Sequence, residues 1–578
     1  MEKLISHYGA YLDQTHPLNE YPRPHFVRKS YFSFNGQWDL TIFASGDRNK
    51  ARYRGKVTVP FAVESLLSGV PRDVYAPGDL LVYERQIALN IPLDAHYFTL
   101  HFEGIDYRYK VIFNQKVIGE QQGGYQALRI TLPISEIKKT NQLIVEVYDD
   151  TFNQYAEKGK QSLNPGGMWY CATSGIYQSV WGEFLPFAPI NGFQTTFDFV
   201  EEKLAITLDV EPATFPVIIS IPRIGHEDIL LEVRTAYTEI PFPHPQLWSS
   251  AHPHLYEISF RTPFEEVYGY FGIRSCKIGE SPFGKAVMIN DEAIFLNGVL
   301  DQGYWPESGL TPPSDAAILD DLRLIKRLGF NTTRVHMKKA SPRYLYHADQ
   351  LGIYVIQDVP AGGRYSFYHQ TLLPTLGFKK VDDHKYAKFG RENPDNRANF
   401  YHLIETMVKE FSYSPALIIW CPFNEGWGQF DAALAYDLIK KLDPQRLIDT
   451  TSGWFDIAKS DFQSEHIYFK KIKFKLRDQR PYLLSEFGGY SYSPEGHTFH
   501  PDKMYGYKKF KTQKEWQDAL VELYQTQIVP AIGQGLSGAI LTQLSDVEEE
   551  TNGLISYDRK ALKVDEVRFR QLMEMLKF

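Results

Sequence analysis

The sequence predicts a multidomain protein with an N-terminal jelly-roll β-sandwich, an immunoglobulin-like β-sandwich and a C-terminal (β/α)8 TIM barrel. The 578 residues exceed one domain at the usual ~150 residues each. Through the first half of the chain, short segments alternate apolar and polar residues, which is typical of antiparallel sheets. After about residue 279 strand-like and helix-like segments alternate, which indicates a parallel sheet. We therefore expect domains at 1–187, 188–278 and 279–578.

The first domain is predicted from segments such as 56–60, 81–89, 96–102 and 143–148, which alternate apolar and polar residues between turn residues. About 160 residues of this kind favour a jelly roll. One hairpin is expected to turn near Asn114 and Gln115. The second domain has similar short strands, for example 203–210 and 216–221, and its length of about 90 residues suits an immunoglobulin-like sandwich.

The third domain contains eight strand candidates, the number that a (β/α)8 barrel needs. They are 293–300, 331–336, 353–358, 416–421, 446–451, 465–469, 482–486 and 537–543. The clearest helix begins after Ser314, a good N-cap, and ends at Gly329. Its Ile318, Leu322 and Ile325 recur at helical spacing and predict the face that packs on the barrel.

Composition and charge narrow the class of partner. The net charge of −8 gives no reason to expect nucleic acid or an anionic membrane. Three distant cysteines, Cys171, Cys276 and Cys421, argue against a disulfide framework and favour a reducing compartment. The N-terminus has no apolar signal-like region, and we find no apolar stretch of about 18 residues. We therefore expect a cytoplasmic protein that binds no membrane, with a homo-oligomer as an open alternative.

Two glutamates at the ends of predicted buried strands indicate a reaction that uses a pair of carboxyl groups. An apolar run from Ala416 ends in Asn424 and Glu425, and a second run from Pro481 ends in Glu486. These are the ends of the fourth and seventh predicted strands, which lie across a barrel mouth from each other, where barrels carry their chemistry. Cleavage of a glycosidic bond needs two such carboxyl groups, a proton donor and a carboxylate.

The neighbours of the two glutamates suggest different roles. Glu425 follows an apolar strand beside Trp427, which favours the neutral acid. Arg334 and the Tyr468 hydroxyl, each at a strand end, are expected to hold Glu486 ionised. Asn424 is placed to hydrogen-bond the 2-hydroxyl of a sugar.

Ordered motifs along nearly the whole chain resemble glycoside hydrolase family 2, which includes β-galactosidases, β-glucuronidases and β-mannosidases. In the sandwiches, the similar segments are Phe102-Glu-Gly-Ile-Asp106-Tyr, Leu247-Trp-Ser-Ser-Ala-His-Pro-His-Leu-Tyr256 and Phe271-Gly-Ile-Arg274. In the barrel, they are Gly329-Phe-Asn-Thr-Thr-Arg334-Val-His336, Trp420-Cys-Pro-Phe-Asn424-Glu425 and Ser485-Glu486-Phe-Gly-Gly. The resemblance implies a retaining, exo-acting hydrolase. Separately, no His/Glu spacing forms a convincing metal site and the mechanism needs no metal, so we expect no metal and no cofactor.

Carried over residue by residue, the resemblance implies that Glu425 is the acid/base and Glu486 the nucleophile. It further implies that Asn424, Tyr468, Arg334 and His336 lie next to the substrate. The remaining residues that we expect to line the pocket are Asp301, Trp305, Asp358, Trp454 and Gln543.

The sugar is less determined than the mechanism. The chain has Thr551-Asn552-Gly-Leu where glucuronidases carry an Asn-x-Lys signature, and its eighth strand ends in Thr542-Gln543 without the usual tryptophan. We take a β-galactoside as the default substrate. The alternatives are another β-glycosidase (β-mannosidase, β-glucuronidase or pentosidase), an endo-acting polysaccharide hydrolase and, more remotely, a non-catalytic carbohydrate-binding protein.

Overall fold

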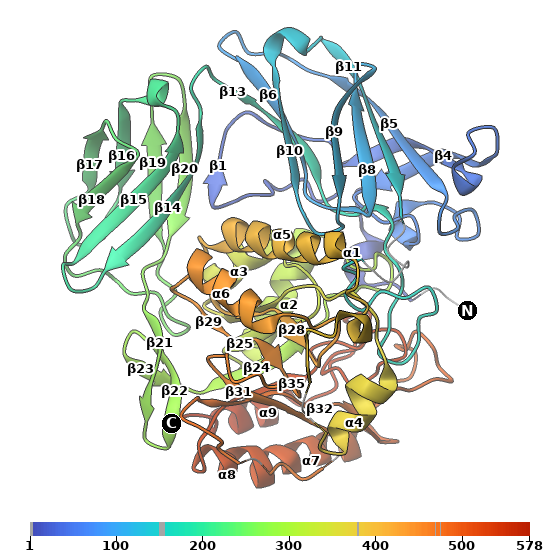
Figure 1. The fold of residues 1–578 in the computed structure, drawn as a ribbon, viewed down its shortest axis with the longest axis vertical. Helices are drawn as coiled ribbons and strands as arrows, with labels where there is room; N and C mark the ends of the chain where they lie inside the picture. The colour runs from blue at the N-terminus through green and yellow to red at the C-terminus, as the bar shows by residue number, and fades with distance from the viewer. Residues whose placement is uncertain (1–3, 150–155, 379–380, 469, 474) are drawn as a thin grey trace.

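A computed structural model describes residues 4–149, 156–378, 381–468, 470–473 and 475–578. Two β-rich units, built from the first half of the chain, lie above and beside a C-terminal unit that mixes strands and helices (Figure 1). No helix within the described ranges has the length and apolarity needed to span a bilayer. Cys171, Cys276 and Cys421 are free thiols.

The first unit packs two antiparallel sheets around one core. Side chains of both sheets, such as Trp38, Val111, Leu100 and Phe184, belong to one buried cluster. The six-stranded sheet contains β4 (Ala51–Val59), β3 (Gly36–Phe43), β5 (Leu80–Ala88), β11 (Thr140–Tyr148), β8 (Arg108–Phe113) and β9 (Lys116–Gln122). The four-stranded sheet contains β10 (Leu128–Pro133), β6 (Tyr97–Phe102), β13 (Val180–Leu185) and β2 (Tyr31–Ser33), and a short pair joins β12 (Gly175–Ile176) to β7 (Ile105–Asp106).

The predicted hairpin is confirmed. Strands β8 and β9 pair antiparallel, and Asn114 and Gln115 form the turn between them with φ of 49° and 69°. Two consecutive residues with positive φ are what a tight two-residue hairpin turn requires, and asparagine tolerates that conformation better than most residues.

The second unit is a smaller pair of sheets around its own core. One sheet contains β14 (Ile190–Asp198), β15 (Lys203–Val210) and β18 (Tyr237–Pro241). The other contains β1 (Phe26–Val27), β20 (Glu266–Phe271), β19 (Tyr256–Arg261), β16 (Val217–Ile221) and β17 (Ile229–Val233). Strand β1 is a finding that the sequence pattern did not predict: a two-residue segment near the N-terminus adds an edge strand to the second unit.

The C-terminal unit is built on an eight-stranded sheet in which every pairing is parallel. Each of the eight predicted strands is found. In chain order they are β24 (Leu296–Asp301), β25 (Thr332–Val335), β26 (Tyr354–Asp358), β27 (Leu417–Cys421), β29 (Leu447–Ile448), β31 (Gln463–Ile467), β32 (Tyr482–Gly488) and β35 (Leu536–Thr542). The first strand pairs with both the second and the eighth, and the seventh pairs with the sixth and the eighth. A hydrogen bond from the Gly453 amide to Ser464 Oγ (3.3 Å) joins the segment after the fifth strand to the sixth.

Short sheets accompany the barrel. Strand β28 (Phe423–Asn424) pairs with β30 (Thr451–Ser452), and β33 (Tyr490–Ser491) pairs with β34 (Lys508–Lys509). The strands β21 (Cys276–Ser281), β22 (Gly284–Ile289) and β23 (Glu292–Ile294) form a three-stranded sheet that runs across the predicted boundary at residue 278.

Helices cover the outside of the barrel. The predicted helix is confirmed as α2 (Asp315–Arg327): the Ser314 side chain accepts the Ala317 amide, and Gly329 follows with φ of 94°. Ile318, Leu322 and Ile325 are buried on its inner face. The other helices are α1 (His7–Ala10), α3 (Pro342–Leu351), α4 (Leu373–Thr375), α5 (Pro394–Phe411), α6 (Ala432–Leu442), α7 (Gln513–Leu523), α8 (Val529–Ile532) and α9 (Glu566–Met573).

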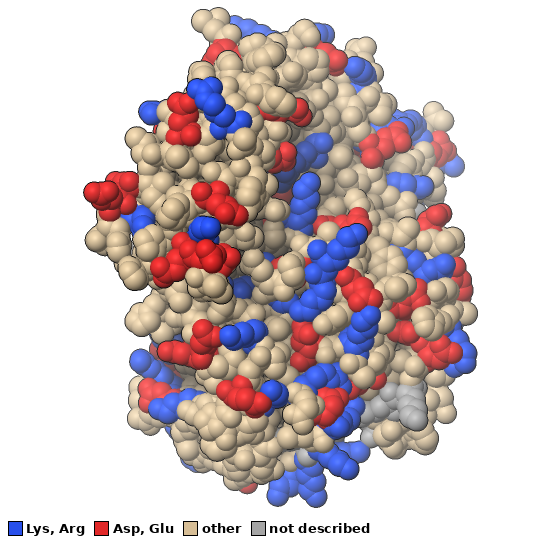
Figure 2. All heavy atoms as spheres, turned by 60° about the vertical axis from the view of Figure 1, so that its left-hand side comes forward, with Lys and Arg blue, Asp and Glu red and all other residues tan. Residues whose placement is uncertain are grey.

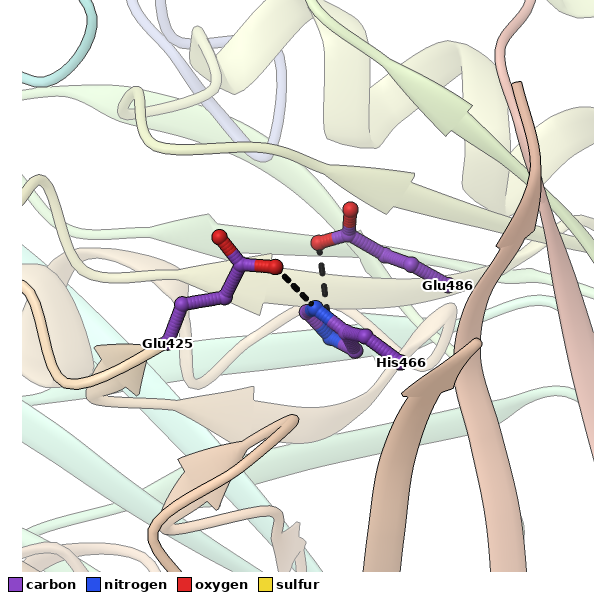
Figure 3. A group of neighbouring side chains, drawn as sticks. All are labelled: Glu425, His466 and Glu486. Carbon is purple, nitrogen blue, oxygen red and sulfur yellow. Dashed lines mark hydrogen bonds and ion pairs between the residues drawn. The ribbon is translucent and has the colours of Figure 1, made fainter. Parts of the chain in front are cut away.

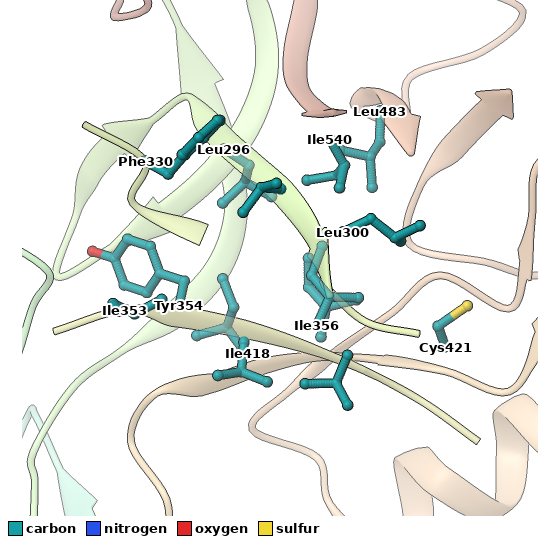
Figure 4. Packing of buried hydrophobic residues seen from close by; sticks show 14 of the residues in the cluster. Leu296, Leu300, Phe330, Ile353, Tyr354, Ile356, Ile418, Cys421, Leu483 and Ile540 are labelled. Carbon is teal, nitrogen blue, oxygen red and sulfur yellow. The ribbon is translucent and has the colours of Figure 1, made fainter. Parts of the chain in front are cut away.

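The barrel interior is an apolar core, not a pore. Leu296, Leu300, Ile356, Leu483 and Ile540, which come from strands on different sides of the sheet, are all buried and approach one another (Figure 4). This packing fixes the strands relative to each other, so the side chains at their carboxyl ends are held in place.

Candidate active site

Glu425 is held by an unusual backbone conformation at the end of the fourth strand. After β27 the chain continues through β28, which pairs with β30, and the Glu425 amide donates to Ser452 O (2.9 Å). Glu425 has φ of 52° and is followed by Gly426 with φ of 74°. A left-handed conformation at a non-glycine residue is strained and is often found at functional sites. The side chain is buried, with 9% exposed.

Glu486 lies within the seventh strand and receives two donors. Arg334 Nη1 donates to Glu486 Oε1 (3.1 Å), and the Tyr468 hydroxyl donates to Oε2. The Tyr468 ring stacks on Tyr507 at 3.9 Å between centroids. Both donors that the sequence assigned to Glu486 therefore contact it.

Arg334 donates hydrogen bonds to residues at the ends of three other strands. Its guanidinium donates to both oxygens of Asp358 (2.9 and 3.1 Å), to Asn424 Oδ1 (2.8 Å) and to Glu486. Asp358 also accepts from His336 Nδ1 (2.8 Å). Because Arg334 is 1% exposed and makes charge-assisted bonds in several directions, it fixes the geometry of this site.

His466 lies between the two glutamates, a placement that the sequence did not predict (Figure 3). Its Nδ1 is 2.7 Å from Glu425 Oε1, and its Nε2 is 3.5 Å from Glu486 Oε1 and 3.2 Å from Ser452 Oγ. The imidazole comes from the end of the sixth strand, two residues before Tyr468. Since residues two apart on a strand face the same side, this spacing was a signal that could have found it.

Burial sets the protonation of the acid and of the imidazole. It raises the pKa of Glu425 to about 7, against smaller lowering effects of Lys160 and Arg334. Burial also lowers the pKa of His466 to about 3, so the ring is neutral at pH 7 and carries one proton. The direction for Glu425 is the one that the sequence predicted from its apolar strand.

The spacing of the two carboxylates limits the chemistry. One oxygen of Glu425, one of Glu486 and one ring nitrogen of His466 all lie within 4.8 Å of one another. Carboxyl groups about 5–5.5 Å apart are typical of retaining glycosidases, whereas inverting enzymes leave room for a water molecule with ~6.5–9.5 Å.

The other predicted residues divide into two sets. His336 and Asp358 belong to the Arg334 network, and Trp454 lies against His466, with its Nε1 3.4 Å from His466 O. Asp301, Trp305 and Gln543 contact residues outside this network. Asp301 is 3.6 Å from Lys338, Trp305 lies under the Arg559 guanidinium (3.9 Å), and Gln543 accepts from Gln302 (2.8 Å).

A segment of the first unit reaches the barrel mouth. The amide of Gly159 donates to Ala361 O (2.9 Å), and the amide of Cys171 donates to Glu548 (2.7 Å). Trp169 stacks on Trp427, with ring centroids 5.1 Å apart. Trp427 follows Glu425 by two residues, so Trp169 packs on a side chain next to the acid in the chain. Lys160, 6% exposed, comes from the same segment and acts on the pKa of Glu425.

The same three central side chains are also the group that can hold a metal ion. Within the described part of the chain, Glu425, His466 and Glu486 offer two carboxylates and an imidazole close together. These are ligand types that Zn²⁺ accepts. An ion there would occupy both carboxylates at once.

A family model shows to which protein family the chain belongs. The model described as "Glycosyl hydrolases family 2, TIM barrel domain" matches residues 283–578, which is half of the chain. The chain belongs to glycoside hydrolase family 2. The matched region contains all eight barrel strands and both glutamates.

Curated relatives of this family 2 chain are similar at low identity. A β-galactosidase of Arthrobacter sp. (strain B7) is 25% identical over 339 residues, covering 58% of this chain and 30% of that protein. A β-galactosidase of Thermoanaerobacter pseudethanolicus is 22% identical over 462 residues, covering 72% of this chain and 56% of that protein. The chain thus spans about a third to just over a half of these relatives.

Solved structures share the fold over nearly the whole length. A β-glucuronidase from uncultured Clostridium sp. superposes with a TM-score of 0.75 at 16% identity, covering 94% of this chain and 97% of that one. A family 2 β-galacturonidase from Eisenbergiella tayi bound to galacturonate gives 0.70 at 18% identity, covering 96% and 98%. The multidomain, β-rich fold of the family is therefore shared along the chain.

Proposed function

We propose that this chain is a retaining exo-β-glycosidase that releases terminal β-linked sugars, with β-galactosides as the default substrate. The observation that carries the proposal is the close approach of the Glu425 and Glu486 oxygens, within 4.8 Å, at the ends of two barrel strands. The names of the curated relatives support galactose as the default sugar.

In the first step, Glu486 attacks the anomeric carbon of the sugar while Glu425 gives its proton to the glycosidic oxygen. The carbon–oxygen bond to the leaving group breaks, the alcohol departs, and an ester links the sugar to Glu486. In the second step, Glu425, now a carboxylate, takes a proton from water. The water oxygen attacks the anomeric carbon, the ester bond breaks, and a β-configured sugar and the Glu486 carboxylate are released.

His466 explains how Glu425 keeps its proton before the first step. The neutral ring carries one proton, and Nε2 faces the Glu486 carboxylate and Ser452, which favours placing it there. Nδ1 is then an acceptor, and at 2.7 Å it takes a hydrogen bond from the protonated Glu425. His466 is thus a positioning residue for the acid.

Asn424 and the Arg334 network complete the assignment. Asn424 Oδ1 accepts from Arg334, so the side-chain amide group is oriented and its NH₂ can donate to the 2-hydroxyl. Such a contact strengthens as the oxocarbenium ion develops. We further propose that Tyr468, His336, Asp358 and Trp454 form the rest of the sugar pocket, with Asp301, Trp305 and Gln543 farther from the reacting carbon.

We also propose that the chain divides into a jelly-roll domain (1–187), an immunoglobulin-like domain (188–278) and the catalytic barrel (279–578). The separate apolar cores of the two sandwiches support this division. The segment of the first domain that meets Ala361 and Glu548 gives that domain a part in shaping the active site.

One observation favours a second candidate, a β-uronosidase. Lys160 is a buried cation, 6% exposed, and its charge acts on both Glu425 and His336. A lysine at this place can pair with the carboxylate of a sugar acid. The Asn-x-Lys signature of glucuronidases would then be replaced by a lysine from another domain.

A panel of nitrophenyl β-glycosides separates the candidates. The galactoside, mannoside, xyloside, glucuronide and galacturonide are compared for kcat/KM with the wild-type chain, Lys160→Met and Glu486→Gln. Preference for the galactoside supports the first proposal, and preference for a uronide that Lys160→Met abolishes supports the second. Wild-type turnover by Glu486→Gln would overturn the nucleophile assignment.

A further inference from the structure

A cavity of about 330 Å³ lies between the first unit and one side of the barrel mouth. Its barrel residues all follow the second, third and fourth strands: they are Met337, the segment 361–365 and Trp427. The first unit contributes Gly159 and Trp169, among others. The volume lies within the ~300–1,000 Å³ that is usual for small-molecule sites.

The position of this cavity relative to the glutamates points to the leaving group. In the proposed first step Glu425 gives its proton to the glycosidic oxygen, so the departing group lies on the Glu425 side of the broken bond. Trp427 shares a tight turn with Glu425, because its amide donates to Asn424 O (2.9 Å). Burial raises the pKa of Tyr365, another lining residue, and the charge of Glu425 adds to this effect. The cavity therefore borders the acid.

Three aromatic rings form one wall of the cavity. Trp169 and Trp427 are stacked, and Tyr365 meets both edge-on, with its ring centroid 5.1 Å from each of theirs. A tight turn holds Trp169, whose carbonyl accepts from the Gly166 amide (2.8 Å). Trp169 and Tyr365 are only half-buried, so part of their ring surface is left for a ligand. Such a wall suits an aromatic ring or the apolar face of a sugar.

The charged side chains that line the cavity are both basic, Lys158 and Arg364. Arg364 is exposed and forms no ion pair with another residue of the described ranges. Burial lowers the pKa of Lys158, because its ammonium group is partly withdrawn from water. A carboxylate in the cavity would stabilise both charges.

The neighbouring acids do not cancel this positive charge. Glu157 is paired with Arg391 (3.0 Å), and Glu549, which accepts from the Gly167 amide, is paired with Lys503 (2.6 Å). The cavity lining thus differs from the outer face in Figure 2, where basic and acidic side chains are intermixed. One sign of charge beside an aromatic wall favours a ring that carries a negative group.

From these features, we propose that the cavity binds a leaving group whose ring bears a carboxylate. The aromatic wall takes the ring, and Lys158 and Arg364 pair with the carboxylate. A neutral sugar would meet only the aromatic wall, and a simple anion would meet only the cations. The carboxylate can belong to an acidic sugar or to an aromatic acid. The inference rests on the proposed hydrolysis, but it concerns the departing unit and not the sugar that Glu486 attacks.

Two matched substrate pairs test the inference, each with the sugar that the nitrophenyl panel selects. In the first pair this sugar is β-linked to 4-hydroxybenzoate or to 4-hydroxybenzamide. In the second it is β-linked to galacturonic acid or to galactose. Each kcat/KM is divided by that of the same enzyme for the β-glycosyl fluoride, whose leaving group is a single atom. Effects of a substitution on the chemistry at the anomeric carbon then cancel.

Arg364→Gln should lower the preference for the charged member roughly 3- to 10-fold in at least one pair, because a charge-assisted hydrogen bond is lost. The pair that responds identifies the source of the carboxylate. Trp169→Ala should weaken both members of that pair by a similar factor. Arg54→Gln, on β4, is the matched control and should behave as wild type, since Arg54 is also exposed and has no ion pair among the described residues.

Two results would contradict the inference in different ways. If Arg364→Gln keeps the wild-type preference in both pairs while the fluoride is turned over, the leaving-group assignment is wrong and the hydrolysis stands. If the wild-type chain turns over neither the fluoride nor any nitrophenyl glycoside, the hydrolysis and the inference are both wrong.

Discussion

The imidazole Nδ1 of His466 lies 2.7 Å from Oε1 of Glu425. At that distance the two groups share one proton. The raised pKa of the acid and the lowered pKa of the ring both place that proton on Glu425 near neutral pH. This contact gives the protonated acid a defined partner before substrate arrives, and it makes the site sensitive to pH.

The rate should fall on the alkaline side as Glu425 loses its proton. With its pKa at about 7, we expect kcat/KM to have an alkaline limb near pH 7. A profile of kcat/KM against pH with a nitrophenyl glycoside measures it. An alkaline limb beyond pH 9 would mean that Glu425 is not the titrating acid.

Replacing His466 should move this limb. In His466→Phe the acceptor for the Glu425 proton is lost, so the neutral acid is less stabilised and its pKa falls. We expect the alkaline limb to shift to lower pH and kcat to fall roughly 10- to 100-fold. His466→Asn, which keeps an acceptor, should lie between the two. A lower rate with an unmoved limb would indicate a structural role only.

The buried Glu425 carboxyl group should lower the free energy of unfolding at high pH. The unfolded chain releases this proton near pH 4.5, whereas the folded chain keeps it until about pH 7. The folded state therefore binds more protons in this window, and stability falls as pH rises through it. Glu425→Gln has no such proton to lose. Relative to wild type, its free energy of unfolding should therefore rise by up to about 3 kcal/mol between pH 4 and pH 8.

Urea unfolding followed by tryptophan fluorescence at both pH values measures that gain. The same Glu425→Gln variant should also lose turnover, because glutamine cannot donate the proton to the leaving group. If the urea midpoints of wild type and Glu425→Gln differ by the same amount at pH 4 and at pH 8, the raised pKa of Glu425 is contradicted.

Zinc should inhibit by occupying the catalytic carboxylates. Glu425, His466 and Glu486 present suitable ligand atoms within 4.8 Å of one another. We expect micromolar to millimolar Zn²⁺ to reduce turnover, a chelator to restore it, and His466→Phe to weaken the inhibition at least tenfold. Inhibition that His466→Phe leaves unchanged would place the metal elsewhere.

Much of the barrel site could be predicted because the residues that form it lie at or near the carboxyl ends of strands. Glu425 and Glu486 come at the ends of apolar segments, and Arg334 and Tyr468 lie at the ends of two further strands; the rank of each strand in the chain gives its place around the sheet. A closed parallel sheet brings those ends to one rim, so sequence order translates directly into proximity.

Contributions from outside the barrel could not be predicted in this way. Lys160 and Trp169 come from an irregular segment of the first unit, where no periodicity indicates a direction. Strand β1 has only two residues, too few to show alternation, and its pairing with β20 depends on the docking of the two units. Asp301 and Trp305 follow the first strand as expected, but Lys338 and Arg559 hold them.

The stereochemistry of the first-formed sugar tests the central claim most directly. Proton NMR of the anomeric signals is recorded during the first minutes of hydrolysis of a nitrophenyl β-glycoside, before mutarotation mixes the anomers. Double displacement through Glu486 gives the β-anomer first, with the α-anomer growing in later. If the α-anomer appears first, the two carboxylates act by single displacement, and the assignment of Glu486 as nucleophile is wrong.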